Sequence, residues 1–237
     1  MPREQSMRRF WDDRARENAL FFVDNQLSYA DPDAAEFFAN GERSLDVMLE
    51  TLGVAVEPDA RVVEIGCGAG RQTRALAARA GDVRALDVSE AMLARARELN
   101  PDLENVDWLH GDGTSLAGVE DSSADVCVSY VVFQHLPDPT LTLGYVREMG
   151  RVLRPGGWAA LQVSNDPSIH RAPAARRQAK TALRALARRG PRGQVDPAWL
   201  GSAVDLGELR DVATAAGLRL ERTAGEGTQF CMALLRR

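Results

Sequence analysis

Residues 62–70 combine a short apolar run, one acid and three glycines at alternating positions, in the order Val-Val-Glu-Ile-Gly-Cys-Gly-Ala-Gly. The apolar run is typical of a buried strand, and Gly66, Gly68 and Gly70 are typical of a tight turn into a helix. Glycine permits a positive φ and a close approach of the backbone to a ligand, because it has no Cβ. The free N–H groups at the start of the following helix can bind polar ligand atoms. The segment therefore predicts a nucleotide-type ligand at the end of the first strand of an α/β sheet.

The spacing of these glycines argues against two common phosphate-binding motifs. A dinucleotide fingerprint requires Gly-x-Gly-x-x-Gly, and Arg71 stands where its third glycine would fall. A P-loop requires Gly-Lys-Ser or Gly-Lys-Thr, which is absent after the turn. A nicotinamide oxidoreductase is therefore disfavoured.

Two acids follow the next two predicted strands. Asp87 ends an apolar strand about 20 residues after the glycine turn, the separation expected for one intervening helix and strand. A carboxylate at this place can accept hydrogen bonds from both hydroxyls of a ribose, although it could also cap a helix. Asp112 lies in the turn Gly111–Thr114 after the third strand. The order of glycine turn and acids favours a nucleoside ligand.

Two further segments complete the pattern. Ser129–Asp138 follows the fourth strand, and Arg147–Gly157 ends in Arg-Pro-Gly-Gly before the fifth. With the glycine turn and the two acids, they resemble the motifs of the class I S-adenosylmethionine-dependent methyltransferases, closest to the small-molecule, type 11-like branch. The resemblance extends from about Glu57 to Gly157 and less clearly over the last two strands. It implies S-adenosylmethionine as cofactor, S-adenosylhomocysteine as product and in-line methyl transfer to a small organic acceptor at O, N or C.

The resemblance also implies roles for single residues. Glu64 would face the methionine amino group, the three glycines would make room for the methionyl and ribose portions, and Asp87 would hold the ribose. Met92 could equally be ordinary helix core, and Asp112 could serve its own turn. The complete set implied for the cofactor is Glu64, Gly66, Gly68, Gly70, Asp87, Val88, Met92, Asp112, Gly113, Thr114 and Tyr130.

One histidine lies in the segment expected at the reaction face. His135 is a candidate general base, because the unperturbed pKa of histidine lies near neutrality, although a histidine here can also lack a catalytic role. Candidate substrate contacts are Trp11, Tyr29, Phe133 and His170, and for the aromatic residues the alternative is packing of the N-terminal helices onto the sheet.

Strands and helices alternate along the chain and must position these residues. We expect an α/β fold: a Rossmann-like, doubly wound, seven-stranded sheet, mostly parallel with an antiparallel C-terminal edge hairpin. The predicted strands are 62–65, 83–88, 106–110, 125–132, 158–164, 218–222 and 230–235. The predicted helices are 3–19, one that starts at Asp31, 71–79, 90–98, 140–153 and 206–216.

Two segments outside this alternation are expected to define the substrate. Residues 1–55 are predicted to be an N-terminal helical lid on a cofactor-binding domain of residues 56–237. That domain carries a variable basic helical insertion at 165–207, in which a helix is expected from Ala174 to Arg189. Between Arg171 and Arg192 lie eight basic residues and no acid. This segment either is a solvated helix face or attracts an anionic group: a phosphate, a carboxylate, a carrier-protein tether or a membrane surface.

Composition narrows the class of protein. With 237 residues, 45% hydrophobic and 27% charged, the chain fits one soluble α/β domain. A net charge of −5 argues against a dedicated nucleic-acid binder. The three cysteines have no metal or disulfide spacing, which favours reduced thiols, no metal and a cytoplasmic location. We expect no transmembrane segment, a small-molecule substrate and a monomer or homodimer.

Two alternatives stay open. An RNA or protein methyltransferase is supported only by the basic segment, and the tetrapeptide Asn/Asp-Pro-Pro-Tyr/Phe of many nucleic-acid enzymes is absent after the fourth strand, where Ser129-Tyr130-Val131-Val132 stands. A regulatory subunit that binds the cofactor without turnover would carry the same motifs.

Overall fold

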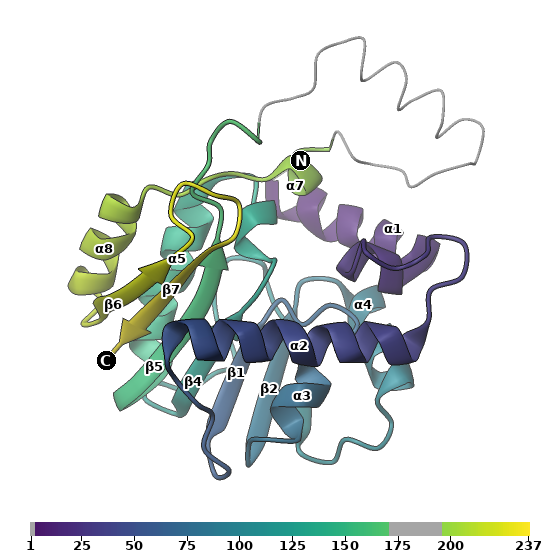
Figure 1. Ribbon diagram of the computed structural model, residues 1–237, viewed down its shortest axis with the longest axis horizontal. Helices are drawn as coiled ribbons and strands as arrows, with labels where there is room; N and C mark the ends of the chain where they lie inside the picture. Colours follow the sequence, from purple (N-terminus) through teal and green to yellow (C-terminus); the bar gives the residue numbers. More distant parts are fainter. Residues whose placement is uncertain (1–2, 171–195) are drawn as a thin grey trace.

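The computed structural model describes residues 3–170 and 196–237, and its centre is one sheet (Figure 1). Within these residues the sheet has seven strands in the order β3-β2-β1-β4-β5-β7-β6. Neighbours from β3 to β5 pair in parallel, whereas β7 is antiparallel to both β5 and β6. The predicted fold class, with its antiparallel edge hairpin, is confirmed. The strands are β1 (Arg61–Ile65), β2 (Asp82–Asp87), β3 (Val106–His110), β4 (Ala124–Ser129), β5 (Leu153–Val163), β6 (Arg219–Ala224) and β7 (Cys231–Arg236).

Most helices begin where a side chain accepts a hydrogen bond from the first turn. Asp33 accepts from the N–H of Glu36, so the N-cap of α2 lies two residues after Asp31, where the helix is predicted to start. The helix predicted from 174 to 189 lies outside the described residues. The helices are α1 (Arg3–Val23), α2 (Ala34–Leu52), α3 (Thr73–Ala77), α4 (Glu90–Leu99), the 3-10 helix η1 (Phe133–His135), α5 (Pro139–Val152), α7 (Pro197–Leu200) and α8 (Leu206–Ala215).

Alternating side chains along the strands decide which face each helix covers. In β1, Val62 packs into a core with α2 and α3, and Val63 packs into the opposite core with α5 and α8. In β4, Val126 and Cys127 divide in the same way. Both faces of the parallel strands are therefore buried, as a doubly wound sheet requires.

The N-terminal helix α1 lies along the edge of the sheet at which the parallel strands end (Figure 1). Its backbone is non-helical at Asn18, where two helical pieces meet. Asp12 fixes the first piece, because its Oδ1 accepts hydrogen bonds from Ser89 Oγ (2.6 Å) and from the N–H of Ala91 (3.2 Å) at the start of α4. By contrast, α2 packs on a face of the sheet.

Two boundaries differ from the prediction at the same edge. The helix expected from 71 begins at Thr73, and the strand expected to end at Val132 ends at Ser129. The strand stops because Val131 has a φ of 58°, which is rare for a β-branched residue. Its N–H donates to Gln162 Oε1 at 2.9 Å, so a side chain rather than a neighbouring strand satisfies it. Residues 130–132 are thereby turned away from the sheet.

Candidate functional site

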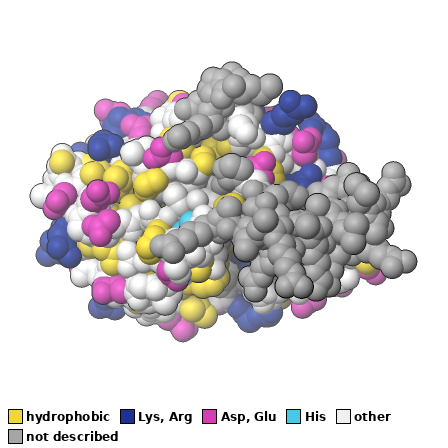
Figure 2. Space-filling model, turned by 90° about the horizontal axis from the view of Figure 1, so that it is seen from above, with side chains coloured by type: hydrophobic (Ala, Val, Ile, Leu, Met, Phe, Trp, Pro, Cys, Tyr) yellow, Lys and Arg dark blue, Asp and Glu magenta, His cyan; other side chains and the backbone are white. Residues whose placement is uncertain are grey.

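A first cavity opens at the carboxyl ends of β1, β2 and β4, beneath α1. It encloses about 1020 Å³ of empty space, its open mouth included. The cavity lies where the strand order reverses between β1 and β4, the usual ligand position in open α/β sheets. Figure 2 looks down on this edge: a histidine and several hydrophobic side chains lie near its centre, and charged side chains lie mainly toward the periphery.

The glycine turn forms one wall of this cavity. Gly66 and Gly68 have φ values of 75° and 55°, and both border the empty space. A Cβ on Gly66 would lie 2.4 Å from Val132 Cγ2, and one on Gly68 would lie 2.8 Å from Val23 Cγ2. Gly70 also has a positive φ, but it lies outside the cavity lining. A Cβ there would lie 2.7 Å from Nδ2 of Asn100, the C-cap of α4. The turn requires all three glycines, and two of them face the cavity.

Asp87 ties the end of β2 to the glycine turn. Its Oδ2 accepts the N–H of Gly68 at 2.8 Å, and its Oδ1 accepts the N–H of Ser89 at 2.9 Å. Burial raises the pKa of Asp87 to about 6, against the effect of these two bonds. Ser89 is the N-cap of α4, since its Oγ accepts the N–H of Met92, so Asp87 does not serve that purpose. Each carboxylate oxygen retains acceptor capacity for a ribose hydroxyl.

Glu64 is a second buried carboxyl in the lining of the first cavity. It is 4% exposed, and Thr73 Oγ1 donates to its Oε2 at 2.5 Å. Burial raises the pKa of Glu64 to about 7, opposed by the Thr73 hydrogen bond and by the charge of Arg71. A buried carboxyl poised near neutrality is suited to pair with an ammonium group of a ligand.

The part of the cavity wall between Asp87 and β3 is apolar. Val88 and Met92 line the cavity, and Met92 is 2% exposed. Gly113 and Ser115, from the loop after β3, face them. Apolar side chains of this kind can pack against a purine ring.

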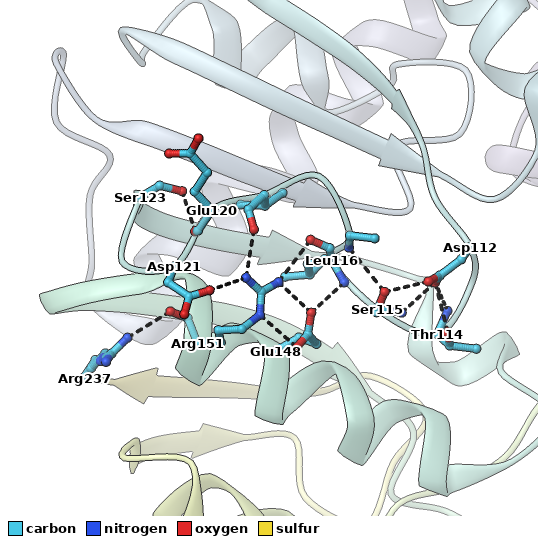
Figure 3. A network of polar contacts seen from close by, with 12 residues as sticks. Asp112, Thr114, Ser115, Leu116, Glu120, Asp121, Ser123, Glu148, Arg151 and Arg237 are labelled. Atoms are coloured by element: carbon cyan, nitrogen blue, oxygen red, sulfur yellow. Dashed lines mark hydrogen bonds and ion pairs between the residues drawn. The ribbon is translucent and has the colours of Figure 1, made fainter.

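Asp112 turns into its own loop (Figure 3). Its carboxylate accepts hydrogen bonds from the N–H groups of Thr114 and Ser115, both at 2.7 Å, and from both of their hydroxyls. Asp112 and Thr114 lie outside the cavity lining. Asp112, which the resemblance implies as a cofactor contact, thus shapes the loop that presents Gly113 and Ser115.

A second cavity adjoins the first on the side of α2, with about 1540 Å³ of empty space, its mouth included. Its walls come from α1 and the loop after it, α2, η1, the segment after β5, α7 and the turn before β7. We call the residues that border both cavities the junction; they are Phe22, Val23, Arg71, Tyr130, Val131 and His135.

Hydrogen bonds fix the proton position on His135. The N–H of Val131 orients the Gln162 amide, whose Nε2 donates to Gln134 Oε1 at 3.0 Å. Gln134 Nε2 then donates to His135 Nε2 (3.2 Å), and His135 Nδ1–H donates to the carbonyl of Trp199 (2.9 Å). Burial lowers the pKa of His135 to about 4, against the effect of the Trp199 carbonyl. A neutral ring whose lone pair is already engaged gives no support to the predicted general base.

Arg71 lies at the junction and is 8% exposed. Its Nη1 is 3.7 Å from Asp24 Oδ2, and its Cζ is 5.8 Å from the centroid of the Tyr130 ring. Burial lowers the pKa of Arg71, and the negative charge of Asp24 opposes this.

The predicted substrate residues divide between cavities and core. Trp11 lines the first cavity, with its ring centroid 5.5 Å from that of His135, and His170 lines the second. Phe133 is 1% exposed and belongs to the core. Tyr29 lies outside both linings and donates a hydrogen bond to α1.

The described ranges 3–170 and 196–237 contain neither a metal-binding cluster nor a helix that could span a membrane. No group of three or more His, Cys, Asp or Glu side chains there could hold a metal ion. No helix in these ranges is long and apolar enough to cross a membrane.

Comparison with known proteins shows which family the middle of the chain resembles. Residues 63–161 match the family described as a methyltransferase domain, over the strands and turns that build the first cavity. This stretch, which is less than half of the chain, is similar to a methyltransferase domain. The match agrees with the resemblance in the motifs.

Relatives of the methyltransferase domain differ in length and activity. The chain is 34% identical over 131 residues to a biotin biosynthesis bifunctional protein of Teredinibacter turnerae, covering 51% of the chain and 22% of that protein. It is 32% identical over 119 residues to a demethylmenaquinone methyltransferase of Staphylococcus aureus, covering 49% and 48%. The chain thus spans half or less of these curated relatives.

A solved structure shares the fold of the methyltransferase domain. An S-adenosylmethionine-dependent methyltransferase of Mesorhizobium loti superposes with a TM-score of 0.59 at 23% identity, covering 82% of this chain and 96% of that one.

Sequence reasoning missed several residues around the methyltransferase domain's cavities. Arg71 was considered only as an argument against a dinucleotide, although an arginine directly after the glycine turn is a visible signal. Phe22, Val23 and Gln134 reach the site from α1 and from η1. Their placement depends on the bend in α1 and on the early end of β4, which local pattern does not reveal.

Proposed function

We propose that this chain is an S-adenosylmethionine-dependent methyltransferase that transfers a methyl group in line to a small organic acceptor, at O, N or C. The observation that carries the proposal is the junction, where a cofactor cavity and a second cavity meet at shared side chains. An in-line displacement needs donor and acceptor on opposite sides of one opening, so this arrangement supports the reaction.

The residues of the first cavity supply binding and orientation. S-adenosylmethionine brings an activated methyl group on a cationic sulfur. Asp87 would hold the ribose, Glu64 the methionyl amino group, and Val88 with Met92 the adenine. Residues 1–55 would contribute α1 as a lid, tied down by Asp12 and closing water out of the junction. The substrate would enter through the second cavity.

The scale of the second cavity and one of the relatives support a small acceptor. The cavity suits a molecule of metabolite size, and the demethylmenaquinone methyltransferase is named for a small organic acceptor. An RNA or protein acceptor would rest on the basic segment 171–192, which lies outside the described residues. A regulatory subunit would bind the cofactor in the same way without transferring the methyl group.

Methyl-labelled S-adenosylmethionine tests the proposal. The purified chain is incubated with three separate acceptor pools: a low-mass metabolite extract, total RNA and total protein. Label in the low-mass pool supports the proposal, and label in RNA or protein replaces it with that alternative. Cofactor binding by calorimetry without transfer to any pool would support a regulatory subunit, and no binding at millimolar cofactor would refute the function altogether.

A further inference from the structure

We propose that the second cavity takes a carboxylic acid with an apolar body and that the carboxylate oxygen is the atom methylated. This inference rests on the proposed function and names the acceptor for the same site. Three features carry it: a cation at the junction, no available base there, and an apolar rim around the second cavity.

The guanidinium of Arg71 faces the second cavity. Its only charged neighbour within ion-pair distance among the described residues is Asp24, which lines the second cavity and not the first. The side chain runs along α2, since a Cβ on Gly41 would lie 2.8 Å from Arg71 Cγ, and α2 borders only the second cavity. In the described part of the chain the guanidinium makes no hydrogen bond. A mostly buried guanidinium with no hydrogen bond in this part of the chain favours an anion that accepts two of its N–H donors, as a carboxylate does.

The junction offers no group that could deprotonate an acceptor. His135 is neutral and its Nε2 lone pair is held by Gln134. Burial raises the pKa of Tyr130, so its hydroxyl stays protonated. Alcohols, phenols and most thiols need a base before they attack, whereas a carboxylic acid is ionised at neutral pH. An amine would arrive as an ammonium ion, which Arg71 repels, and the acid in the lining of the second cavity, Asp24, is already paired with Arg71.

The rim of the second cavity gives the acceptor's body a place to lie. Val47, Ile169 and Phe230 are the exposed large hydrophobic residues among those described, with exposures of 53%, 40% and 51%. All three border the second cavity, although they come from α2, the segment after β5 and the turn before β7. Apolar side chains gathered at one opening indicate a ligand with apolar surface. An acceptor whose carboxylate lies at Arg71 would place its apolar body against this rim.

The transfer balances without a proton. A lone pair of the carboxylate oxygen forms the new O–CH₃ bond while the C–S bond breaks and its electron pair stays on sulfur. The negative charge of the acceptor and the positive charge of the sulfonium both disappear. The products are a methyl ester and S-adenosylhomocysteine, so no base is required.

Calorimetry with three matched probes tests this inference. Octanoate, octanamide and octylamine have the same chain and differ in charge, and each is titrated into the chain saturated with S-adenosylhomocysteine. We expect octanoate to bind about tenfold or more tightly than either other probe, as a difference of one charge-assisted contact gives. In Arg71→Gln this preference should fall below about threefold while the S-adenosylhomocysteine affinity changes little. Arg95→Gln, on the exposed face of α4, is the matched control and should keep the preference.

The outcomes separate the two proposals. Failure of S-adenosylhomocysteine to bind contradicts the proposed function. Normal S-adenosylhomocysteine binding with equal affinities for the probes, with preference for the amine or amide, or with no probe bound overturns the carboxylate inference alone. Arg71→Gln that loses the cofactor and keeps the octanoate preference would assign Arg71 to the cofactor and overturn it as well.

Discussion

The two cavities that meet at the junction are built in different ways. Most of the first is made of backbone turns at strand ends, from the glycine turn to the loop after β4, within residues 64–145 apart from α1. The second takes its walls from segments as far apart as Phe22 and Phe230. The cofactor side is thus encoded locally in motifs, whereas the acceptor side exists only once the chain has folded. This difference explains why one half of the site can belong to a broad family and the other half can be particular to this chain.

The largest expected effect concerns the first cavity, on the cofactor side. Asp87→Ala should raise the Kd of S-adenosylhomocysteine about 100-fold, because two charge-assisted hydrogen bonds to the ribose and the tie to Gly68 are lost together. Calorimetry measures the change. Asp107→Ala, which removes an exposed carboxylate on β3, is the control and should leave the Kd unaltered. A loss of less than fivefold in Asp87→Ala would contradict the assignment of this residue.

The next effect is the pH dependence of cofactor binding. Glu64 has a pKa of about 7 in the empty cavity, so it is largely protonated below that pH. An ammonium group prefers the carboxylate, so affinity for S-adenosylmethionine should rise with pH, by up to about tenfold per unit below pH 7, and level off above it. Titrations from pH 6 to pH 8 measure this rise, and Glu64→Gln should flatten it. An affinity in the native chain that falls with pH would show that Glu64 does not pair with the cofactor.

A smaller effect distinguishes the two predicted acids. The Asp112 carboxylate is engaged by Thr114 and Ser115, so Asp112→Ala should lower the free energy of unfolding by about 1–2 kcal/mol through the loop. The Kd of S-adenosylhomocysteine should change by no more than about fivefold. Denaturant unfolding and calorimetry measure the two quantities. If binding fell as far as in Asp87→Ala with stability intact, Asp112 would have to turn into the cavity when the cofactor binds.

The smallest effect concerns His135, at the junction of the two cavities. Because the pKa of His135 is lowered to about 4, its ring should stay neutral between pH 8 and pH 6. The ring proton signals in an NMR titration, assigned by their loss in His135→Asn, should not move over that range. A titration midpoint near pH 6.5 would show that the Nε2 lone pair of His135 is available for a proton, and it would restore the general-base hypothesis.

Sequence reasoning located the sheet and the cofactor side because both follow short-range rules. Short apolar runs predicted the strands, and Gly66 and Asp87 lie at strand ends where turn chemistry is visible in the sequence. It could not give the end of β4, where Gln162 satisfies the N–H of Val131 from another strand. Nor could it show that Phe133 is core while Gln134, its neighbour, borders the second cavity. Those outcomes depend on contacts between segments far apart in the chain.

A crystal structure of the chain with S-adenosylhomocysteine tests the central claim most directly. We expect the ribose hydroxyls to bind Asp87 and the amino group to lie beside Glu64. The sulfur should lie at the junction, with its open side toward the second cavity. A sulfur walled off from the second cavity, or a ligand outside the glycine turn, would contradict it.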